Sequence, residues 1–483
     1  MSLARRASLN IALKALGELG RVAWALLLIL VARHLGGESL GRIAFAYSFT
    51  TIFVLLTDLG MNILVVREVA RDRDAAGHYL GNLLSIKLIS APVAFGLITA
   101  AITLSGYSSD VVTVVLLFAG IAIVRGVLQL YGAVFSGLEV MGREAVLKNL
   151  YQVSLFLSGG FALAVGCGPL GMSVALLIAS LFSLLIGSGM VWRMMPHVRL
   201  LWDGARWLSL VRQALPLAMT TMFIILYNES DVVLLSYLGE GERGVGAYAA
   251  ASKILKVLQL IPMLVVSGVY PVFSDLARGP RDALNTAYRG TLKLLLLIAI
   301  PLAIVVASFA EPFIRLIYGQ GFAPAIPPLR LLAVSVPFVY LGYALVNVLV
   351  SSDHMAWAAL VTGAACVVNV AANLLLIPVL GISGSAIAST AAQGALVAIG
   401  AVAIERAVTR SGWIQLASKP MVAGAAMLLA ITLVGRASWI LAFPAGLGTY
   451  LLALVLTGSL REEEFAAVKR LWRNVAPQRV RHP

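Results

Sequence analysis

The chain has 483 residues, of which 60% are hydrophobic and only 12% are charged, and its mean hydropathy is +0.95. A soluble domain devotes about a quarter of its residues to charge, so water is excluded as the solvent for most of this surface. The net charge of +14 does not indicate a nucleic-acid partner, because the Lys and Arg residues stand mainly in short segments between apolar runs. That distribution is typical of a membrane protein whose loops meet anionic lipid headgroups.

Apolar runs long enough to cross a bilayer recur from one end of the chain to the other. A hydrocarbon core roughly 30 Å thick requires about 20 apolar residues, and backbone groups in lipid must be paired within a helix. We therefore predict an all-α polytopic membrane protein with about fourteen transmembrane helices. The expected spans are residues 9–32, 40–60, 80–104, 111–136, 146–166, 170–192, 211–238, 246–270, 287–310, 329–350, 356–377, 382–405, 418–435 and 438–458.

The charge of the connecting segments predicts the orientation of the chain. Of the 36 Lys and Arg residues, most stand in one alternate set of segments, which includes both ends of the sequence. Segments rich in Lys and Arg stay on the cytoplasmic side of a membrane. We therefore expect a multi-pass protein of the cytoplasmic (inner) membrane with both termini in the cytoplasm.

The first twelve spans are predicted to form two related halves. Residues 35–46 and 238–249 both read as Leu-Gly, an acidic turn, and then glycine opening a helix with small and aromatic residues. Six spans are an even number, so the halves would be parallel repeats with a cavity between them; chance similarity of apolar stretches is the alternative. The expected parts are an N-terminal six-helix bundle (1–193), a basic cytoplasmic linker (194–210), a C-terminal six-helix bundle (211–406), helices thirteen and fourteen (407–458) and a basic cytoplasmic tail (459–483).

Five cations inside the apolar spans are the candidate substrate-binding residues. A charged side chain near the bilayer centre is costly unless it faces a partner or a wet cavity. Arginine forks fit phosphate oxygens, and the shared positive sign favours a phosphate or diphosphate substrate. For Lys87 the alternative is that its side chain snorkels to the cytoplasmic face. The candidates are Arg21, Lys87, Arg125, Lys253 and Lys256.

Three acidic residues in the spans are candidates for ion coupling or charge pairing: Glu18, Glu229 and Asp231. Glu18 stands three residues before Arg21, on the same helical face. Asp231 and Lys253 each lie about eight residues from the external turn between them, roughly 12 Å deep, so we expect them to form an ion pair. Glu18 and Asp231 are expected either to carry a coupling proton or to be fixed partners of these cations.

The sequence contains no arrangement of residues that is typical of catalysis. Its five histidines stand in loops, at helix ends or in the tail, and none has metal-ligand spacing with other residues. Cys167 and Cys366 are interpreted as packing residues, so we expect no cofactor, no metal and no enzymatic activity. A membrane-bound glycan polymerase or ligase would need sizeable external loops, whereas the longest loop expected on that side, residues 311–328, is mostly apolar.

Four sets of short sequence motifs, in chain order, carry a resemblance to a known family. They are Thr-Asp-Leu-Gly-Met at 57–61 with Arg-Glu-Val-Ala-Arg-Asp at 67–72, Asp-Val-Val-Leu-Leu at 231–235 with Tyr-Pro-Val-Phe-Ser at 270–274, Phe-Ile-Arg-Leu-Ile-Tyr-Gly at 313–319, and Asn-Val-Ala-Ala-Asn at 369–373 with Gly-Ile-Ser-Gly-Ser at 381–385. Together they resemble the polysaccharide-biosynthesis and O-antigen flippases of the multidrug/oligosaccharidyl-lipid/polysaccharide exporter superfamily.

The resemblance implies two six-helix bundles around a cation-lined cavity that opens to one side of the membrane at a time. It implies translocation of an undecaprenyl-diphosphate-linked oligosaccharide, for O-antigen or exopolysaccharide synthesis, driven by an ion gradient or the membrane potential. Arg21, Lys253 and Lys256 match positions at which such proteins place cavity cations, whereas Lys87 and Arg125 rest on the helix argument alone. The implied partners are the polyprenyl-diphosphate-linked glycan, membrane lipids, a glycan polymerase and chain-length proteins.

Two other transporters remain as alternatives. A lipid II flippase would share the architecture. A cation-coupled drug exporter of the same superfamily would need an acidic cavity for cationic drugs, whereas the candidate residues here are mainly basic.

Overall fold

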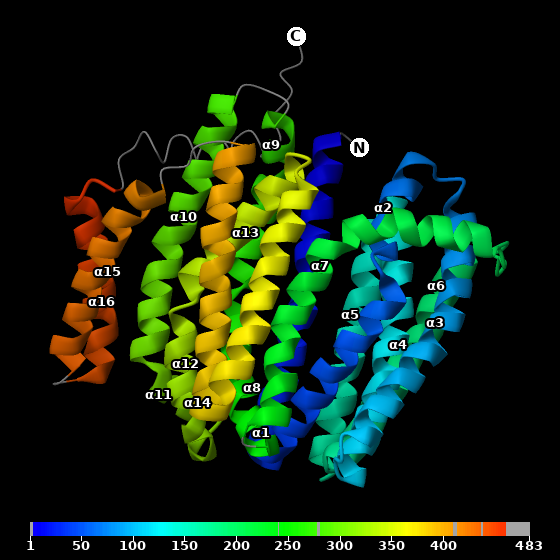
Figure 1. Ribbon diagram of the computed structural model, residues 1–483, viewed down its shortest axis with the longest axis horizontal. Helices are drawn as coiled ribbons and strands as arrows, with labels where there is room; N and C mark the ends of the chain where they lie inside the picture. The colour runs from blue at the N-terminus through cyan, green and yellow to red at the C-terminus, as the bar shows by residue number, and fades with distance from the viewer. Residues whose placement is uncertain (1–2, 240, 278–280, 409–412, 436–437, 460–483) are drawn as a thin grey trace. The chain divides into compact units, whose positions relative to one another are not determined.

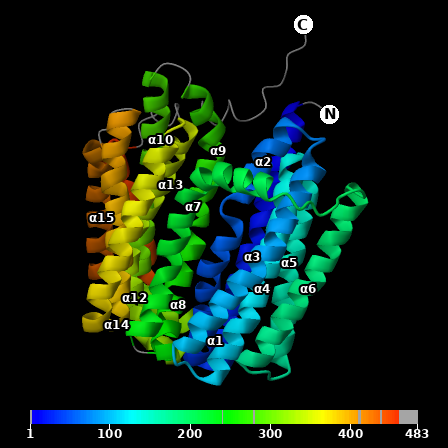
Figure 2. The same cartoon turned by 45° about the vertical axis from the view of Figure 1, so that its right-hand side comes forward.

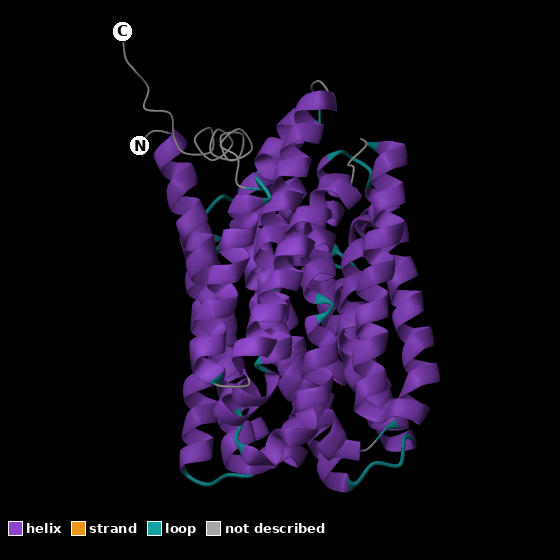
Figure 3. Ribbon diagram, turned by 90° about the vertical axis from the view of Figure 1, so that its left-hand side faces the viewer, coloured by secondary structure: helices purple, strands orange, loops and turns teal. Residues whose placement is uncertain are grey.

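The computed structural model describes residues 3–239, 241–277, 281–408, 413–435 and 438–459, and every regular element in these ranges is a helix (Figures 1 and 3). The prediction of an all-α chain is therefore confirmed. The elements are α1 (Leu3–Asp58), α2 (Met61–Arg71), α3 (Ala76–Leu104), α4 (Ser109–Gly137), α5 (Met141–Ala164), α6 (Pro169–Met194), α7 (Gly204–Leu238), α8 (Gly241–Leu258), α9 (Leu260–Leu276), α10 (Arg281–Ser308), α11 (Ala310–Ile317), the 3-10 helix η1 (Gln320–Ala325), α12 (Ile326–Ala333), α13 (Val336–Ser351), α14 (Met355–Ala407), α15 (Trp413–Gly435) and α16 (Trp439–Leu456).

The helices have the length and apolar composition of a polytopic membrane protein. Within the described residues, nine are long and apolar enough to cross a membrane, or ten if the bent pair Gln320–Ala333 and Val336–Ser351 counts as one span. This number is below the predicted fourteen because α1 and α14 each join two predicted spans, and because three other predicted spans are not among the nine. Polar residues occupy the first half of α5, the bent pair is counted separately, and Ile440–Leu456 of α16 is an apolar helix that is too short.

A glycine in the left-handed backbone region joins two predicted spans within each of the longest helices. In α1 the joining residue is Gly36, with φ of 80°, and in α14 it is Gly381, with φ of 55°. Glycine adopts this conformation without steric cost. Each of these helices therefore consists of two helical segments that meet at a kink, as the predicted spans require.

One predicted loop is wrong. Residues 311–328, expected as the longest external loop, are largely helical, because they contain α11, η1 and the start of α12. An ion pair between Glu311 and Arg315, 2.7 Å apart and one turn from each other, is consistent with the helical geometry of α11.

Two compact units make up the chain. The first is Arg6–Ala250, and the second is Ala251–Pro483 together with Met1–Arg5. In the first unit α4 packs against α2, α3, α5 and α6, while α7 contacts α2 and α3. In the second unit α10 packs against α9, α12, α13 and α15, and α15 packs against α16. The two six-helix bundles predicted from the sequence, 1–193 and 211–406, divide the chain at a different place from these units and stay a prediction.

Candidate functional site

Two of the predicted site residues, Glu18 and Arg21, stand on α1 where the backbone is helical, but their side chains lie outside the described residues. The other six predicted residues are described. Lys87, Arg125, Glu229 and Asp231 belong to the Arg6–Ala250 unit, and Lys253 and Lys256 belong to the unit that begins at Ala251.

Lys87 on α3 is buried beside an acidic partner at the end of α1. Its Nζ lies 3.6 Å from Oδ1 of Asp58 and donates to the backbone carbonyl of Thr57 at 3.4 Å. The exposed fractions of the two charged side chains are 5% for Lys87 and 27% for Asp58. Asp58 was not among the predicted site residues, although it belongs to one of the motifs that carry the family resemblance.

A left-handed turn places Asp58 at this position. Leu59 and Gly60, with φ of 41° and 81°, follow Asp58 and end α1. A Cβ on Gly60 would lie 2.7 Å from the carbonyl oxygen of Ala214 on α7, so only glycine allows this close approach. The carboxylate therefore stands at the C-terminal end of α1, against α3.

Arg125 on α4 is held by uncharged groups of the second segment of α1. Its Nη2 donates to Oγ1 of Thr51 at 3.0 Å. The guanidinium carbon lies 5.1 Å from the ring centroid of Tyr47, which is the geometry of a cation–π contact. Tyr47 also packs against the ring of Trp24, with centroids 5.8 Å apart. Among the described side chains, this cation is thus held by a hydroxyl and a ring.

Glu229 on α7 contacts the same stretch of α1. Its Oε2 accepts a hydrogen bond from the hydroxyl of Ser48 at 2.6 Å. Ser48 stands between Tyr47 and Thr51 in the sequence, and the charges of Glu229 and Arg125 interact electrostatically. We call Tyr47, Ser48, Thr51, Arg125 and Glu229 the Arg125 cluster. Two predicted residues that are far apart in the sequence are therefore brought to one short stretch of α1.

Asp231 lies two residues further along α7 and is 3% exposed. Its Oδ2 accepts a hydrogen bond from the hydroxyl of Tyr248 at 2.6 Å. The predicted ion pair with Lys253 stays a prediction, because the two residues belong to different compact units. Lys253 and Lys256 are both partly buried on α8.

The two repeated turns recognised in the sequence meet at a close crossing of α1 and α8. A Cβ on Gly41 would lie 1.8 Å from the carbonyl oxygen of Glu242, and a Cβ on Gly246 would lie 1.9 Å from that of Gly37. Each helix therefore needs glycine at the point of contact. The sequence similarity marked these turns but gave no sign that they touch.

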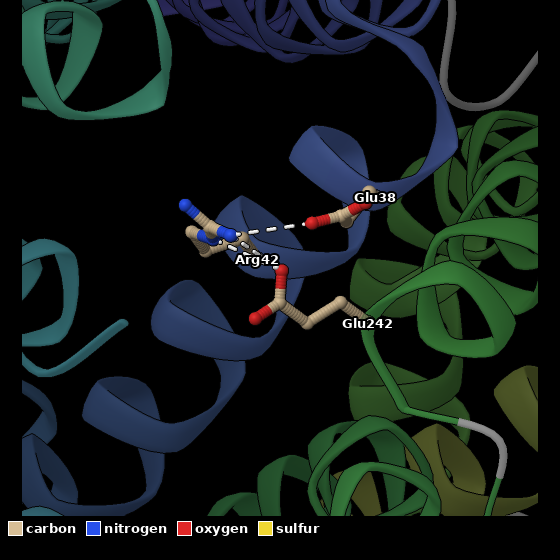
Figure 4. A network of polar contacts seen from close by, with 3 residues as sticks. All are labelled: Glu38, Arg42 and Glu242. Carbon is tan, nitrogen blue, oxygen red and sulfur yellow. Dashed lines mark hydrogen bonds and ion pairs between the residues drawn. The ribbon is translucent and has the colours of Figure 1, made fainter. Parts of the chain in front are cut away.

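Arg42 joins the two sides of this crossing and was not predicted as a site residue (Figure 4). Its Nη2 lies 2.9 Å from Oε2 of Glu242 and 3.5 Å from Oε1 of Glu38, and its Nε donates to Glu242 at 3.0 Å. The Arg42 side chain is 18% exposed and that of Glu242 is 23% exposed. The Arg42–Glu242 pair is thus partly shielded from water, which strengthens it relative to surface pairs, whereas Glu38 is 69% exposed.

Tyr107, in the turn between α3 and α4, lies near the end of α7. Its hydroxyl is 2.7 Å from that of Ser236, and its ring centroid is 5.0 Å from that of Phe45. Burial raises the pKa of Tyr107 to about 12, although the hydrogen bond with Ser236 acts in the opposite direction. The hydroxyl therefore stays protonated at neutral pH.

Among the described residues there is no group of three His, Cys, Asp or Glu side chains that could hold a metal ion. Cys167 is a partly buried free thiol and Cys366 a buried one, and their interpretation as packing residues stays a prediction. The described chemistry of the site is therefore that of cations, carboxylates, hydroxyls and rings.

Comparison with known proteins agrees with this architecture. The sequence model of the family described as polysaccharide biosynthesis protein matches residues 11–277, and that of the MatE family matches residues 216–408. The probable low-salt glycan biosynthesis flippase Agl15 of Haloferax volcanii is 24% identical over 469 residues, which cover 91% of this chain and 93% of that protein.

Solved transporters share the fold. The lipid II flippase MurJ in an inward closed conformation superimposes with a TM-score of 0.74 at 13% identity, covering 93% of this chain and 99% of that chain. An inward-facing multidrug resistance MATE family transporter of the MOP superfamily gives a TM-score of 0.67 at 18% identity, covering 80% and 94%.

The helical architecture and these comparisons define a polytopic membrane transporter of the multidrug/oligosaccharidyl-lipid/polysaccharide exporter superfamily. The first family model matches more than half of the sequence. The chain therefore belongs to the polysaccharide biosynthesis protein family, and the resemblance stated from its motifs is confirmed.

Proposed function

We propose that the chain is a flippase that moves a polyprenyl-diphosphate-linked oligosaccharide, of the undecaprenyl type, across the cytoplasmic membrane by alternating access. The observation that carries the proposal is the Arg125 cluster. A hydroxyl and a ring face hold the Arg125 guanidinium, and the charge of Glu229 interacts with it in the same cluster. A guanidinium held in this way can turn its remaining N–H groups to phosphate oxygens.

The remaining candidate cations are assigned to the same substrate. Arg21, Lys253 and Lys256 are proposed to contact the diphosphate along its path. Lys87 would join them only in a conformation that separates it from Asp58, its partner at 3.6 Å. Glu18, Glu229 and Asp231 are proposed as coupling groups or charge partners, and Glu229 already interacts with the charge of Arg125.

The biological setting is proposed by extension from the family. We assign the chain to O-antigen or exopolysaccharide synthesis, with both termini in the cytoplasm and with a glycan polymerase and chain-length proteins acting on the translocated product. The name of the Haloferax volcanii relative, a probable glycan biosynthesis flippase, supports a glycan substrate. Transport of a lipid-linked substrate requires no covalent chemistry, so we propose no catalytic residue.

The decisive experiment compares Arg125→Gln with Arg330→Gln, an exposed arginine on α12. Purified protein in liposomes is given a radiolabelled polyprenyl-diphosphate oligosaccharide, and its movement to the opposite leaflet is measured. Arg125→Gln should lower the rate roughly ten- to hundred-fold, the range for losing a hydrogen bond to a charged group. Arg330→Gln should transport normally.

Two outcomes would contradict the proposal. The proposed function would be wrong if the wild-type protein moved no lipid-linked oligosaccharide and cells without this protein still exported their surface glycan. Normal transport by Arg125→Gln would show that Arg125 does not bind the substrate, while the proposed flippase function would still stand. A preference for lipid II over the oligosaccharide in competition would favour the lipid II flippase alternative.

A further inference from the structure

The connection between α6 and α7 lies at the surface of the Arg6–Ala250 unit. The chain leaves α6 at Met194, has no regular structure up to Asp203 and enters α7 at Gly204. Figure 2 shows the first turns of α7 running crosswise to α3–α6 before the chain turns into the long part of the helix. Pro216 stands inside α7 and can kink it there. We call residues 192–215 the strap.

Backbone contacts and buried apolar groups hold the strap in place. The carbonyl oxygen of Arg199 would lie 2.2 Å from a Cβ on Gly81 of α3, so the strap touches α3 backbone to backbone. Asp203 caps α7, because its carboxylate accepts from the backbone N–H of Arg206 at 3.1 Å. Leu210 is 3% exposed and Ala214 is fully buried. None of these contacts uses an arginine side chain.

The outer surface of the strap combines positive charge with large apolar side chains. Its four arginines are all exposed: Arg193, Arg199, Arg206 and Arg212. The exposed fractions of its large apolar residues are 68% for Trp192, 45% for Leu200, 63% for Trp202, 53% for Leu208 and 42% for Leu215. Asp203 is the one acidic residue in this stretch of sequence, and its carboxylate is engaged at the start of α7.

This combination fits the boundary between lipid headgroups and acyl chains. Exposing the tryptophan and leucine side chains to water is unfavourable, and so is placing the arginine side chains in the hydrocarbon core. At the interface, indole rings sit at the headgroup level and arginines reach the phosphates. We propose that the strap binds the headgroups of anionic phospholipids, with its four arginines on the phosphates and Trp192 and Trp202 at the acyl boundary.

The proposal is tested by the lipids that the full chain retains. Protein is incorporated into nanodiscs of equal phosphatidylglycerol and phosphatidylcholine, extracted mildly, and its bound lipids are counted by native mass spectrometry. The wild type should retain phosphatidylglycerol preferentially, and 0.5 M salt should weaken this preference. The triple variant Arg199→Gln/Arg206→Gln/Arg212→Gln should lower the ratio of the two lipids at least roughly three-fold, since each arginine near an anionic surface contributes roughly five-fold in affinity.

The matched control replaces three exposed arginines of other segments, in the variant Arg243→Gln/Arg315→Gln/Arg330→Gln. It should keep the wild-type ratio of bound phosphatidylglycerol to phosphatidylcholine. Thermal unfolding in pure phosphatidylcholine shows whether the strap variant is folded, and it should match the wild type there. A strap variant with the wild-type lipid ratio, or a control that loses the preference equally, would overturn the proposal.

A second measurement does not depend on the arginines. Brominated acyl chains quench tryptophan fluorescence only at close range, so replacing Trp192 and Trp202 with Ser should remove a quenched component of the emission. If the quenched fraction stays the same, these rings do not lie at the acyl boundary and the proposed placement is wrong.

Discussion

Lys87 and Arg125 are cations on apolar helices of the same compact unit, but their surroundings differ in kind. Lys87 has the carboxylate of Asp58 at 3.6 Å, so its charge is largely neutralised by a partner. Arg125 is held by the hydroxyl of Thr51 and the ring of Tyr47, which carry no net charge. Lys87 is thus paired with a carboxylate at 3.6 Å, whereas Arg125 is held by neutral groups and interacts electrostatically with Glu229.

From this difference we infer a structural role for Lys87, and it supports the binding role proposed for Arg125. Removing one member of a buried ion pair leaves the other charge without compensation, so the pair should matter for stability. A cation positioned by neutral groups has little to lose in stability and retains its attraction for an anion. We therefore expect changes at Lys87 to appear in the free energy of unfolding and changes at Arg125 to appear in transport.

The largest expected effect is on the Lys87–Asp58 pair. Lys87→Met should lower the free energy of unfolding by about 2–4 kcal/mol, because it leaves the Asp58 charge unpaired. This range extends below the usual value for a buried pair because Asp58 is 27% exposed. Unfolding in mixed micelles by titration with sodium dodecyl sulfate measures the loss.

The double variant Lys87→Met/Asp58→Asn sharpens this test. It removes both charges, so it should regain most of the stability that either single variant loses. Losses that simply add would show that the two charges are not coupled. In the same assay Arg125→Gln should lose less than about 1 kcal/mol, and a larger loss would erase the distinction between the two cations.

The sequence predicted the elements better than their contacts. Apolar runs identified the membrane helices because hydrocarbon requires a minimum length of helix. Residues 311–328 were expected as a loop because they stand between two predicted apolar spans, yet they form α11, η1 and the start of α12. Local periodicity is too weak a signal in helices of six to eight residues.

The candidate site shows the same limit. Lys87 and Arg125 could be found because charge stands out in an apolar span. Their partners could not, because the turn at Leu59 and Gly60 that carries Asp58 to Lys87 depends on tertiary packing. The hydroxyl of Thr51 and the ring of Tyr47 are common in membrane helices and give no signal until the fold places them beside Arg125.

A smaller effect is expected at Tyr47. Tyr47→Leu removes the ring beneath the Arg125 guanidinium, and a cation–π contact is worth about 0.5–2 kcal/mol, which corresponds to roughly two- to thirty-fold in transport rate. Tyr47→Phe keeps the ring and should retain most of the activity. Initial rates in the liposome assay measure the effect. Equal loss in both variants would mean that the hydroxyl, and not the ring, positions Arg125.

The smallest effect is expected at Thr51, where Thr51→Val removes the hydroxyl that accepts from Arg125 and changes the side-chain volume little. The loss should be about 0.5–1.5 kcal/mol, or roughly two- to thirteen-fold in rate, because the ring still holds the guanidinium. Thr113→Val is the matched control, since its hydroxyl on α4 is exposed and donates to the backbone carbonyl of Ser109. If Thr51→Val instead abolished transport while Tyr47→Leu did not, the hydroxyl alone would fix the cation.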